Sequence, residues 1–446
     1  MATSITFQQL NLSKPLLTAL DSLGFTHPTT IQHRVFPIAM SGKDVCGIAQ
    51  TGTGKTLAYL LPCLRQWTFN KQQTPQILVI VPTRELVTQI VSTIQQVTAF
   101  MQITVVGVYG GTNINTQTLA LANGVDILVA TPGRLYDLAM NGAFKVKTIK
   151  KVVIDEMDEL LNLGFRTQLK NILDLLPAKR QNLLFSATVT PDVAALIDVY
   201  FNQPIWVEAA PAGTPVEKIE QCLYHVPNFN TKVHLLQWLL QSDANMSKVL
   251  IFTASKQLAD DLYEQLAPDF ADTMGVIHSN KEQNHRFNTV RQFRSGAYRM
   301  VIATDIVARG IDIDEVTHVI NFDLPNTPEQ YLHRIGRTGR SDKQGIAISF
   351  VTEKEKVLLV AIETQMQREV LAKPLPAEVT ISNVLTDAEK PKIQLQPSIV
   401  LLPKREASGP AFHPKSAKNS KVNVRKSRKD VMQKKYGKPQ KRKSKK

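Results

Sequence analysis

The chain has 446 residues, of which 43% are hydrophobic and 20% charged, so it is long enough for two or three domains that each bury a core. No stretch approaches the roughly 18 consecutive apolar residues of a membrane-spanning helix, which argues against an integral membrane protein. The three cysteines, Cys46, Cys63 and Cys222, are too scattered for a disulfide framework or a cysteine-based zinc site. The first residues lack the basic and apolar regions of a signal peptide, so we expect a cytoplasmic protein without membrane association.

The net charge of +15 comes entirely from one end of the sequence. Residues 404–446 hold 17 Lys and Arg against 2 Asp and Glu, whereas residues 1–403 hold 36 of each kind. This segment has few apolar residues and no periodic pattern, which predicts a disordered cationic arm that binds polyanions without reading their sequence. The same run is also compatible with a solubility tail, or with a nuclear localisation signal at residues 441–446 that would leave a nuclear or nucleolar location open.

Short β-branched segments alternate with helical ones along most of the chain. Buried strands are expected first at residues 44–48, 76–81, 125–130, 151–154 and 182–185, with a helix at 85–98, and then at 249–252, 300–303, 318–321 and 346–351. This alternation predicts right-handed crossovers and parallel, doubly wound sheets. The sequence therefore predicts an α/β protein with a first domain at 1–208, a linker of small residues and prolines at 209–217, a second domain at 218–368, and a proline-containing, then basic, disordered tail at 369–446.

A glycine-rich turn follows the first predicted strand. Residues 49–56 read AQTGTGKT, and a helix is predicted to begin near Lys55. Backbone N–H groups in such a turn can cradle phosphates, Lys55 can reach the β- and γ-phosphates, and the Thr56 hydroxyl can bind Mg²⁺. The generic pattern has glycine where this chain has Ala49, so a plain strand-to-helix turn is the alternative.

An acidic segment follows the strand predicted at 151–154. It reads Asp155-Glu156-Met157-Asp158, and ligands bind at the carboxyl ends of strands in open α/β sheets. Asp155 can hold Mg²⁺, and Glu156 can orient or deprotonate an attacking water. The alternative is that these carboxylates only cap the start of the next helix.

A third motif, HRIGRTGR at residues 333–340, places an arginine cluster in the second predicted domain. In this order the motifs resemble the DEAD-box family of ATP-dependent RNA helicases, over about residues 5–360. The resemblance implies two tandem RecA-like P-loop domains, ATP and Mg²⁺ as cofactors, and RNA-stimulated ATP hydrolysis coupled to unwinding of short RNA duplexes or remodelling of RNA–protein complexes. It also implies a monomer whose partner is RNA, contacted through its backbone, and it is compatible with ribosomal or degradosome-type protein partners.

The resemblance assigns roles to individual residues. The nucleotide-binding positions are Phe7, Phe25, Gln32, Thr51, Gly52, Thr53, Gly54, Lys55, Thr56 and Asp312. The catalytic positions are Asp155, Glu156 and the arginine fingers Arg337 and Arg340, with Thr56 and Asp155 as metal ligands. The RNA-binding positions are Pro82, Thr83, Arg84, Gly111, Thr131, Arg134, Arg286 and Thr304. The positions that couple hydrolysis to strand separation are Asp158, Ser186, Thr188 and His333. Within this set, Gln32 is expected to read the adenine edge and Phe25 to pack on the base.

One residue departs from the family pattern. Met157 stands where the family has alanine, and methionine carries a longer, flexible side chain. Because all three carboxylates are retained, we expect metal binding and water activation to survive. The change bears on the packing of the acidic segment against Ser186 and Thr188, and hence on the coupling.

Two other functions stay open. An ATP-gated RNA clamp or assembly scaffold with little turnover is favoured only by Met157. A DNA helicase is disfavoured by the segment around Gln32, because that segment is typical of the RNA helicases. The sequence does not specify an RNA or a pathway.

Overall fold

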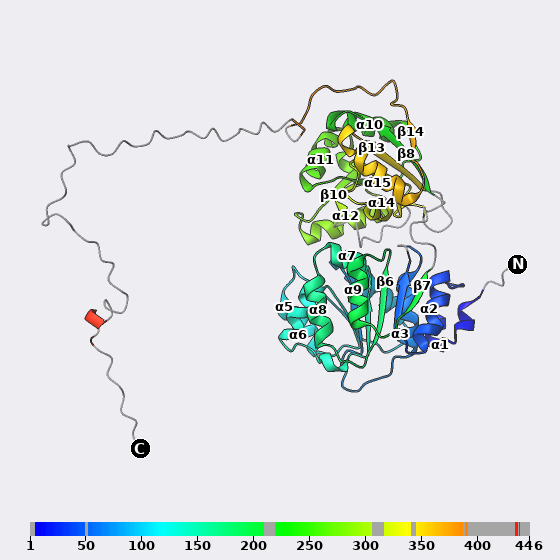
Figure 1. The fold of residues 1–446 in the computed structure, drawn as a ribbon, viewed down its shortest axis with the longest axis vertical. Coiled ribbons are helices and arrows are strands. Elements are labelled where there is room, and N and C mark those ends of the chain that lie inside the picture. Colours follow the sequence, from blue (N-terminus) through cyan, green and yellow to red (C-terminus); the bar gives the residue numbers. More distant parts are fainter. Residues whose placement is uncertain are drawn as a thin grey trace, which may run out of the picture. The chain divides into compact units, whose positions relative to one another are not determined.

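The computed structural model of the chain describes residues 5–49, 52–208, 219–305, 316–339, 345–386, 389–390, 433–435 and 437. Residues up to Lys390 form one compact unit, and residues from Pro391 onward form a separate one. The first unit contains two sheets (Figure 1), and we call residues 5–208 the first lobe and residues 219–390 the second lobe. The predicted linker at 209–217 and the site residues Thr51, Asp312 and Arg340 lie outside the described residues.

The first lobe is built on a parallel sheet with the order β3-β4-β2-β5-β6-β1-β7. The strands are β1 (Val45–Ile48), β2 (Ile77–Ile80), β3 (Val105–Val108), β4 (Ile127–Ala130), β5 (Lys151–Ile154), β6 (Gln181–Ser186) and β7 (Ile205–Glu208). The helices are α1 (Lys14–Ser22), α2 (Thr30–Met40), α3 (Lys55–Arg65), α4 (Arg84–Val97), α5 (Ile114–Ala122), α6 (Pro132–Met140), α7 (Met157–Asn162), α8 (Arg166–Leu175) and α9 (Pro191–Tyr200).

Two helical layers cover the two faces of this sheet. Along the central strands, alternate side chains point into different cores, as Val153 and Leu183 do on one face and Val152 and Leu184 on the other. Helices α1–α4 pack on the first of these faces and α5–α9 on the second. Since both faces are covered, the central strands are apolar throughout, and this pattern is what made them predictable.

The second lobe repeats this plan. Its parallel sheet has the order β10-β11-β9-β12-β13-β8-β14, which is the order of the first sheet with each strand replaced by its counterpart along the chain. The strands are β8 (Ile219–His225), β9 (Val249–Phe252), β10 (Met274–Ile277), β11 (Met300–Ala303), β12 (His318–Asn321), β13 (Gly345–Val351) and β14 (Leu371–Lys373). The helices are α10 (Phe229–Ser242), α11 (Lys256–Phe270), α12 (Gln283–Ser295), α14 (Pro328–Ile335) and α15 (Lys356–Met366). The predicted fold class, two doubly wound parallel α/β domains in tandem, is confirmed.

The second lobe extends beyond the predicted boundary at residue 368. Residues 371–373 form β14, which pairs in parallel with β8. The chain then continues as a strap, by which we mean residues 374–386 with 389 and 390. Val379 in the strap is buried in the core beside α10, and Leu375 packs against the same core. This part of the predicted disordered tail is therefore ordered, because single apolar residues between the prolines anchor it to the lobe.

None of the helices within the described ranges is long and apolar enough to cross a bilayer.

Candidate nucleotide and RNA site

The phosphate loop joins β1 to α3 in a conformation that needs glycine. Gly52 and Gly54 have φ angles of +85° and +90°, in the left-handed region that side chains other than glycine rarely adopt. The next residue, Lys55, is the first of α3 and is only 6% exposed. Its Nζ has no hydrogen-bond partner within the described part of the chain. A buried ammonium group without a partner is costly, so the loop fits an anion at the helix N-terminus, as a nucleotide phosphate would provide.

The segment predicted to read adenine is tied directly to this loop. The Gln32 side chain donates from Nε2 to the Gly54 carbonyl at 3.1 Å and accepts at Oε1 from the Thr29 backbone N–H at 3.0 Å. A Cβ atom on Gly54 would clash with the Gln32 amide, which is a second reason for glycine there. Phe25 is 44% exposed, whereas Phe7 is buried in the core of the first lobe. Phe7 is therefore placed to support this segment rather than to face a base.

The acidic segment lies at the carboxyl end of β5, beside the phosphate loop. Glu156 precedes α7 with a φ angle of +52°, an uncommon conformation for a residue other than glycine. Burial raises the pKa of Asp155, while the nearby Lys55 ammonium opposes that rise. Burial likewise raises the pKa of Glu156, opposed by Lys55 and by Arg337 from the second lobe. Carboxyl groups with raised pKa values are typical of general bases.

Asp158 connects the acidic segment to the end of β6. Its Oδ2 accepts from the Thr188 hydroxyl at 3.0 Å and from the Thr188 and Ala187 backbone N–H groups at 3.0 and 3.2 Å. The Asp158 backbone N–H donates to the Ser186 hydroxyl at 3.2 Å. Burial by itself would raise the pKa of Asp158, but His333, Lys55 and these hydrogen bonds hold the pKa below its ordinary value. Asp158 is thus held as a carboxylate.

Contacts between the lobes bring together residues far apart in the sequence. His333 lies with Nδ1 3.8 Å from the Glu159 carboxylate, which is 1% exposed. In a second contact between the lobes, the Glu85 carboxylate pairs with the Arg286 guanidinium at 2.5 Å and accepts from the Gln283 amide at 3.0 Å. Neither Glu85 nor Glu159 has a role assigned from the sequence, although each directly follows a residue that does.

Both lobes match known families. The DEAD/DEAH box helicase profile matches residues 29–196, and the helicase conserved C-terminal domain profile matches residues 231–342. The chain is 38% identical over 364 residues to the DEAD-box ATP-dependent RNA helicase CshA of Geobacillus kaustophilus, covering 82% of this chain and 77% of that protein. It is also 38% identical over 371 residues to the RNA helicase CrhR of Synechocystis, covering 83% of this chain and 75% of that protein.

The chain belongs to the DEAD-box family of ATP-dependent RNA helicases. Its fold agrees with that membership. The structure of S. cerevisiae Dbp5 bound to RNA and ADP BeF3 matches this helicase with a TM-score of 0.75 and 29% identity, over 83% of this chain and 96% of that one. The two lobes are therefore tandem RecA-like domains.

The residues predicted to contact RNA lie where strands of this helicase end. Pro82 and Thr83 follow β2, Gly111 lies just beyond β3, Thr131 follows β4, and Thr304 follows β11. Because the strands of each sheet are parallel, each sheet gathers its share of these residues at its carboxyl edge. Such a row of hydroxyls and backbone groups is suited to phosphates and 2′-hydroxyls rather than to base edges.

Two arginines of this row have defined positions. A Cβ atom on Gly111 would clash with the Arg84 guanidinium, so glycine is what lets Arg84 lie over that turn. Arg134 donates to the Gln117 side chain and to the Thr112 carbonyl, both at 2.8 Å. Neither guanidinium is fully buried, so both retain donors for a ligand.

Met157 does not point into the catalytic network. Its side chain is 1% exposed and belongs to the core on the second face of the first sheet, which also contains Leu160 and Cys46. The hydrogen bonds of Asp158 to Ser186 and Thr188 are formed in its presence. The methionine therefore alters the core behind the acidic segment and leaves that segment's polar contacts in place.

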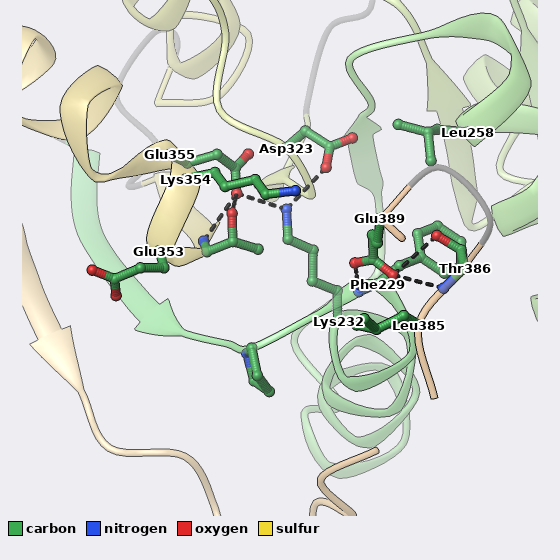
Figure 2. Close-up of a pocket in the computed structure, with 12 residues that line it drawn as sticks. Phe229, Lys232, Leu258, Asp323, Glu353, Lys354, Glu355, Leu385, Thr386 and Glu389 are labelled. Atoms are coloured by element: carbon green, nitrogen blue, oxygen red, sulfur yellow. Dashed lines mark hydrogen bonds and ion pairs between the residues drawn. The ribbon is translucent and has the colours of Figure 1, made fainter. Parts of the chain in front are cut away.

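The second lobe has its own cavity at the position that corresponds to the nucleotide site (Figure 2). This cavity of about 410 Å³ lies where β8, β12 and β13 end, just as the phosphate loop and acidic segment lie where β1 and β5 end. Its lysine, Lys232, is 3% exposed and pairs with Asp323 at 2.9 Å and with Glu355 at 3.0 Å. The Glu389 carboxylate of the strap accepts from the Phe229 backbone N–H at 2.6 Å, at the first residue of α10.

Lys55 and Lys232 thus hold equivalent positions in the two lobes but differ in the groups that contact their ammonium. In the first lobe the Lys55 ammonium has no hydrogen-bond partner among the described residues, whereas in the second lobe two carboxylates neutralise Lys232 and a third carboxylate occupies the helix N-terminus. A phosphate would find its favourable contacts already taken in the second lobe.

Proposed function

We propose that this helicase hydrolyses ATP in the first lobe, is stimulated by RNA, and uses lobe closure to separate short RNA duplexes or to remodel RNA–protein complexes. The observation that carries the proposal is the buried Lys55 ammonium, which lacks a hydrogen-bond partner among the described residues and lies beside Asp155 and Glu156. Arg337 of the second lobe is near enough to Glu156 to oppose the rise in its pKa that burial causes, as an arginine finger would be.

In this mechanism Glu156 acts as the general base. Its carboxylate takes a proton from the attacking water, or orients that water, while Lys55 and the loop N–H groups hold the phosphates. Arg337, and by family resemblance Arg340, would stabilise the charge that develops on the transferred phosphoryl group. Because Arg337 comes from the second lobe, hydrolysis would depend on closure of the lobes.

Thr56 and Asp155 are the residues that would hold Mg²⁺. A hydroxyl and a carboxylate oxygen suit this hard cation, which is commonly held by one or two protein oxygens together with substrate phosphates. When bound, Mg²⁺ would neutralise phosphate charge. No cluster of three or more His, Cys, Asp or Glu within the described residues offers a competing site for a metal ion.

RNA would be gripped by the carboxyl edges of both sheets. Closure is favoured when ATP and RNA bind the closed state better than the open one. The contact of Glu85 with Arg286 links the first-lobe RNA residues to those of the second lobe, so RNA and closure are expected to support each other. Hydrolysis and release of phosphate would remove the ATP that favours the closed state, and the lobes would reopen.

The alternative function, an ATP-gated RNA clamp with little turnover, is favoured only by Met157, and that side chain packs in the core.

The deciding experiment is the steady-state ATPase rate of the full chain with single-stranded RNA, with single-stranded DNA and with neither. We expect RNA to stimulate turnover more than DNA does. In Glu156→Gln, turnover should fall about 10²-fold or more, while ATP-dependent RNA binding persists.

The pH dependence gives an independent check on Glu156. A general base must be deprotonated, so activity should fall as the pH drops through the raised pKa of Glu156, above the ordinary glutamate value of about 4.3. Equal turnover in the wild-type protein and in Glu156→Gln, with tight ATP-dependent RNA binding in both, would favour a clamp.

A further inference from the structure

Tyr59 contacts the Asp155 carboxylate, although it belongs to none of the motifs and has no role in the proposed mechanism. It is on α3, one turn after Thr56, and is fully buried. Its hydroxyl donates to Asp155 Oδ2 at 3.0 Å. A buried phenol group therefore touches Asp155, one of the two side chains that are expected to hold Mg²⁺.

The Tyr59 ring is locked in place by its neighbours. It packs against Phe185 of β6 with ring centroids 5.3 Å apart and an interplanar angle of 53°. The Phe185 ring in turn lies over Gly47 of β1, where a Cβ atom would come within 2.6 Å of a ring carbon. Glycine in the middle of this strand is thus required by the ring that supports Tyr59.

The Tyr59 hydroxyl donates to one of the two Asp155 oxygens, Oδ2. Asp155 is then fixed at both oxygens, since its Oδ1 accepts from the Glu156 backbone N–H at 2.9 Å. Each carboxylate oxygen accepts more than one hydrogen bond or metal contact, so both remain able to bind a ligand.

We propose that Tyr59 is a positioning residue for the magnesium site, whose hydroxyl orients Asp155 before the metal ion and nucleotide arrive. The proposal rests on the proposed function of this site. Partners of this kind, which orient a metal ligand without touching the metal, commonly change metal affinity about 10- to 100-fold when they are removed. The alternative is that the hydroxyl serves only the fold, by giving a buried carboxylate one more donor.

Tyr59→Phe separates these two roles, because it removes the hydroxyl and keeps the ring that packs on Phe185. The binding of a fluorescent methylanthraniloyl-ADP to the full chain is measured while Mg²⁺ is titrated, and again with EDTA. We expect the Mg²⁺ concentration for half-maximal binding to rise about 10- to 100-fold in the variant. The affinity measured in EDTA should stay within about twofold, since the phosphate loop is unchanged.

Tyr200→Phe is the matched control. Tyr200 ends α9 and donates to Asp174 Oδ1 at 2.8 Å, so this variant loses the same type of hydrogen bond outside the nucleotide site. Its Mg²⁺ titration should match that of the wild-type protein. An unchanged or lower half-maximal Mg²⁺ concentration in Tyr59→Phe would overturn the positioning role while leaving the proposed function intact. Failure of the wild-type protein to bind the nucleotide at all would instead count against the proposed function.

Discussion

The segment Asp155–Asp158 divides its side chains between two environments. Its carboxylates lie at the phosphate loop and at the end of β6, whereas Met157 lies among the apolar side chains behind the sheet. The change from alanine to methionine is therefore a change of core volume. The residue at position 157 should therefore affect the free energy of unfolding more than the rate of ATP hydrolysis, because cores respond to the loss of even a methylene group.

We predict that Met157→Ala lowers the free energy of unfolding by about 2–5 kcal/mol, the usual cost of a large-to-small change at a buried position. The RNA-stimulated ATPase rate should stay within about tenfold, which corresponds to about 1.4 kcal/mol in barrier height. Denaturant unfolding and steady-state kinetics on the same preparation check both values. A folded variant without ATPase activity would show that the catalytic carboxylates depend on the methionine.

At the scale of secondary-structure elements, the strap decides where the second lobe ends. It holds the first turn of α10 through backbone and side-chain hydrogen bonds. The Ser382 backbone N–H donates to the Thr231 hydroxyl at 3.0 Å, and the Asn230 side chain donates to the Val384 carbonyl at 2.8 Å. Together with Glu389, these contacts hold the start of the helix that carries Lys232, whose ammonium pairs with Asp323 and Glu355.

Two truncations test this boundary. A chain that stops after Lys373 loses the strap and the tail, and we expect its second lobe to lose about 3 kcal/mol of stability, from several hydrogen bonds and one buried valine. A chain that stops after Lys390 keeps the described part of the strap and should unfold at the wild-type denaturant concentration. Equal stability of the two truncated chains would place the end of the lobe at β14 and show that the strap adds nothing to it.

At the scale of the whole molecule, the positive charge is concentrated in residues 404–446, while the rest of the chain is balanced. Residues beyond the strap belong to a unit separate from the lobes. The carboxyl edges of the sheets and the basic segment would therefore contribute to RNA affinity in different ways. The former would depend on ATP, and the latter on ionic strength.

We predict that deletion of residues 404–446 weakens RNA binding and flattens its salt dependence, while basal ATPase activity persists. For single strands, each lost phosphate contact should reduce the slope of log affinity against log salt by about 0.7. RNA affinity measured from low to moderate salt, with and without the deletion, gives this slope directly. An unchanged slope would show that the segment does not contact phosphates.

The sequence predicted the fold best where strands are buried on both faces. The segments expected at 151–154, 249–252, 300–303 and 318–321 coincide with β5, β9, β11 and β12. The edge strands β3, β7 and β14 were not predicted, because partly exposed positions or short lengths break the apolar run, and β8 and β10 were also missed although most of their positions are buried. The residues of the strap were predicted to belong to the disordered tail, because a segment with several prolines and few apolar residues is typical of disorder.

For the candidate site, the order of the motifs in the sequence was sufficient to predict the groups that carry the chemistry. It did not predict the neighbouring residues that hold those groups in place. Tyr59 and Asp155 are 96 positions apart, and they meet only because the sheet places the β1–α3 connection near the end of β5. No local pattern marks a tyrosine on a buried helix face as a neighbour of a catalytic carboxylate. The same holds for Glu159 and Glu85, whose partners belong to the other lobe.

The repeated strand order has a consequence for how ligand binding and folding are linked. Both lobes place a buried lysine near the start of the helix that follows the first strand of the repeat. In the second lobe the countercharges are part of the polypeptide, so the site is complete once the chain has folded. In the first lobe no described group hydrogen-bonds the Lys55 ammonium, so a bound nucleotide is expected to add stability to that lobe. The stability of one half of a duplicated architecture should therefore respond to its ligand, whereas that of the other half should not.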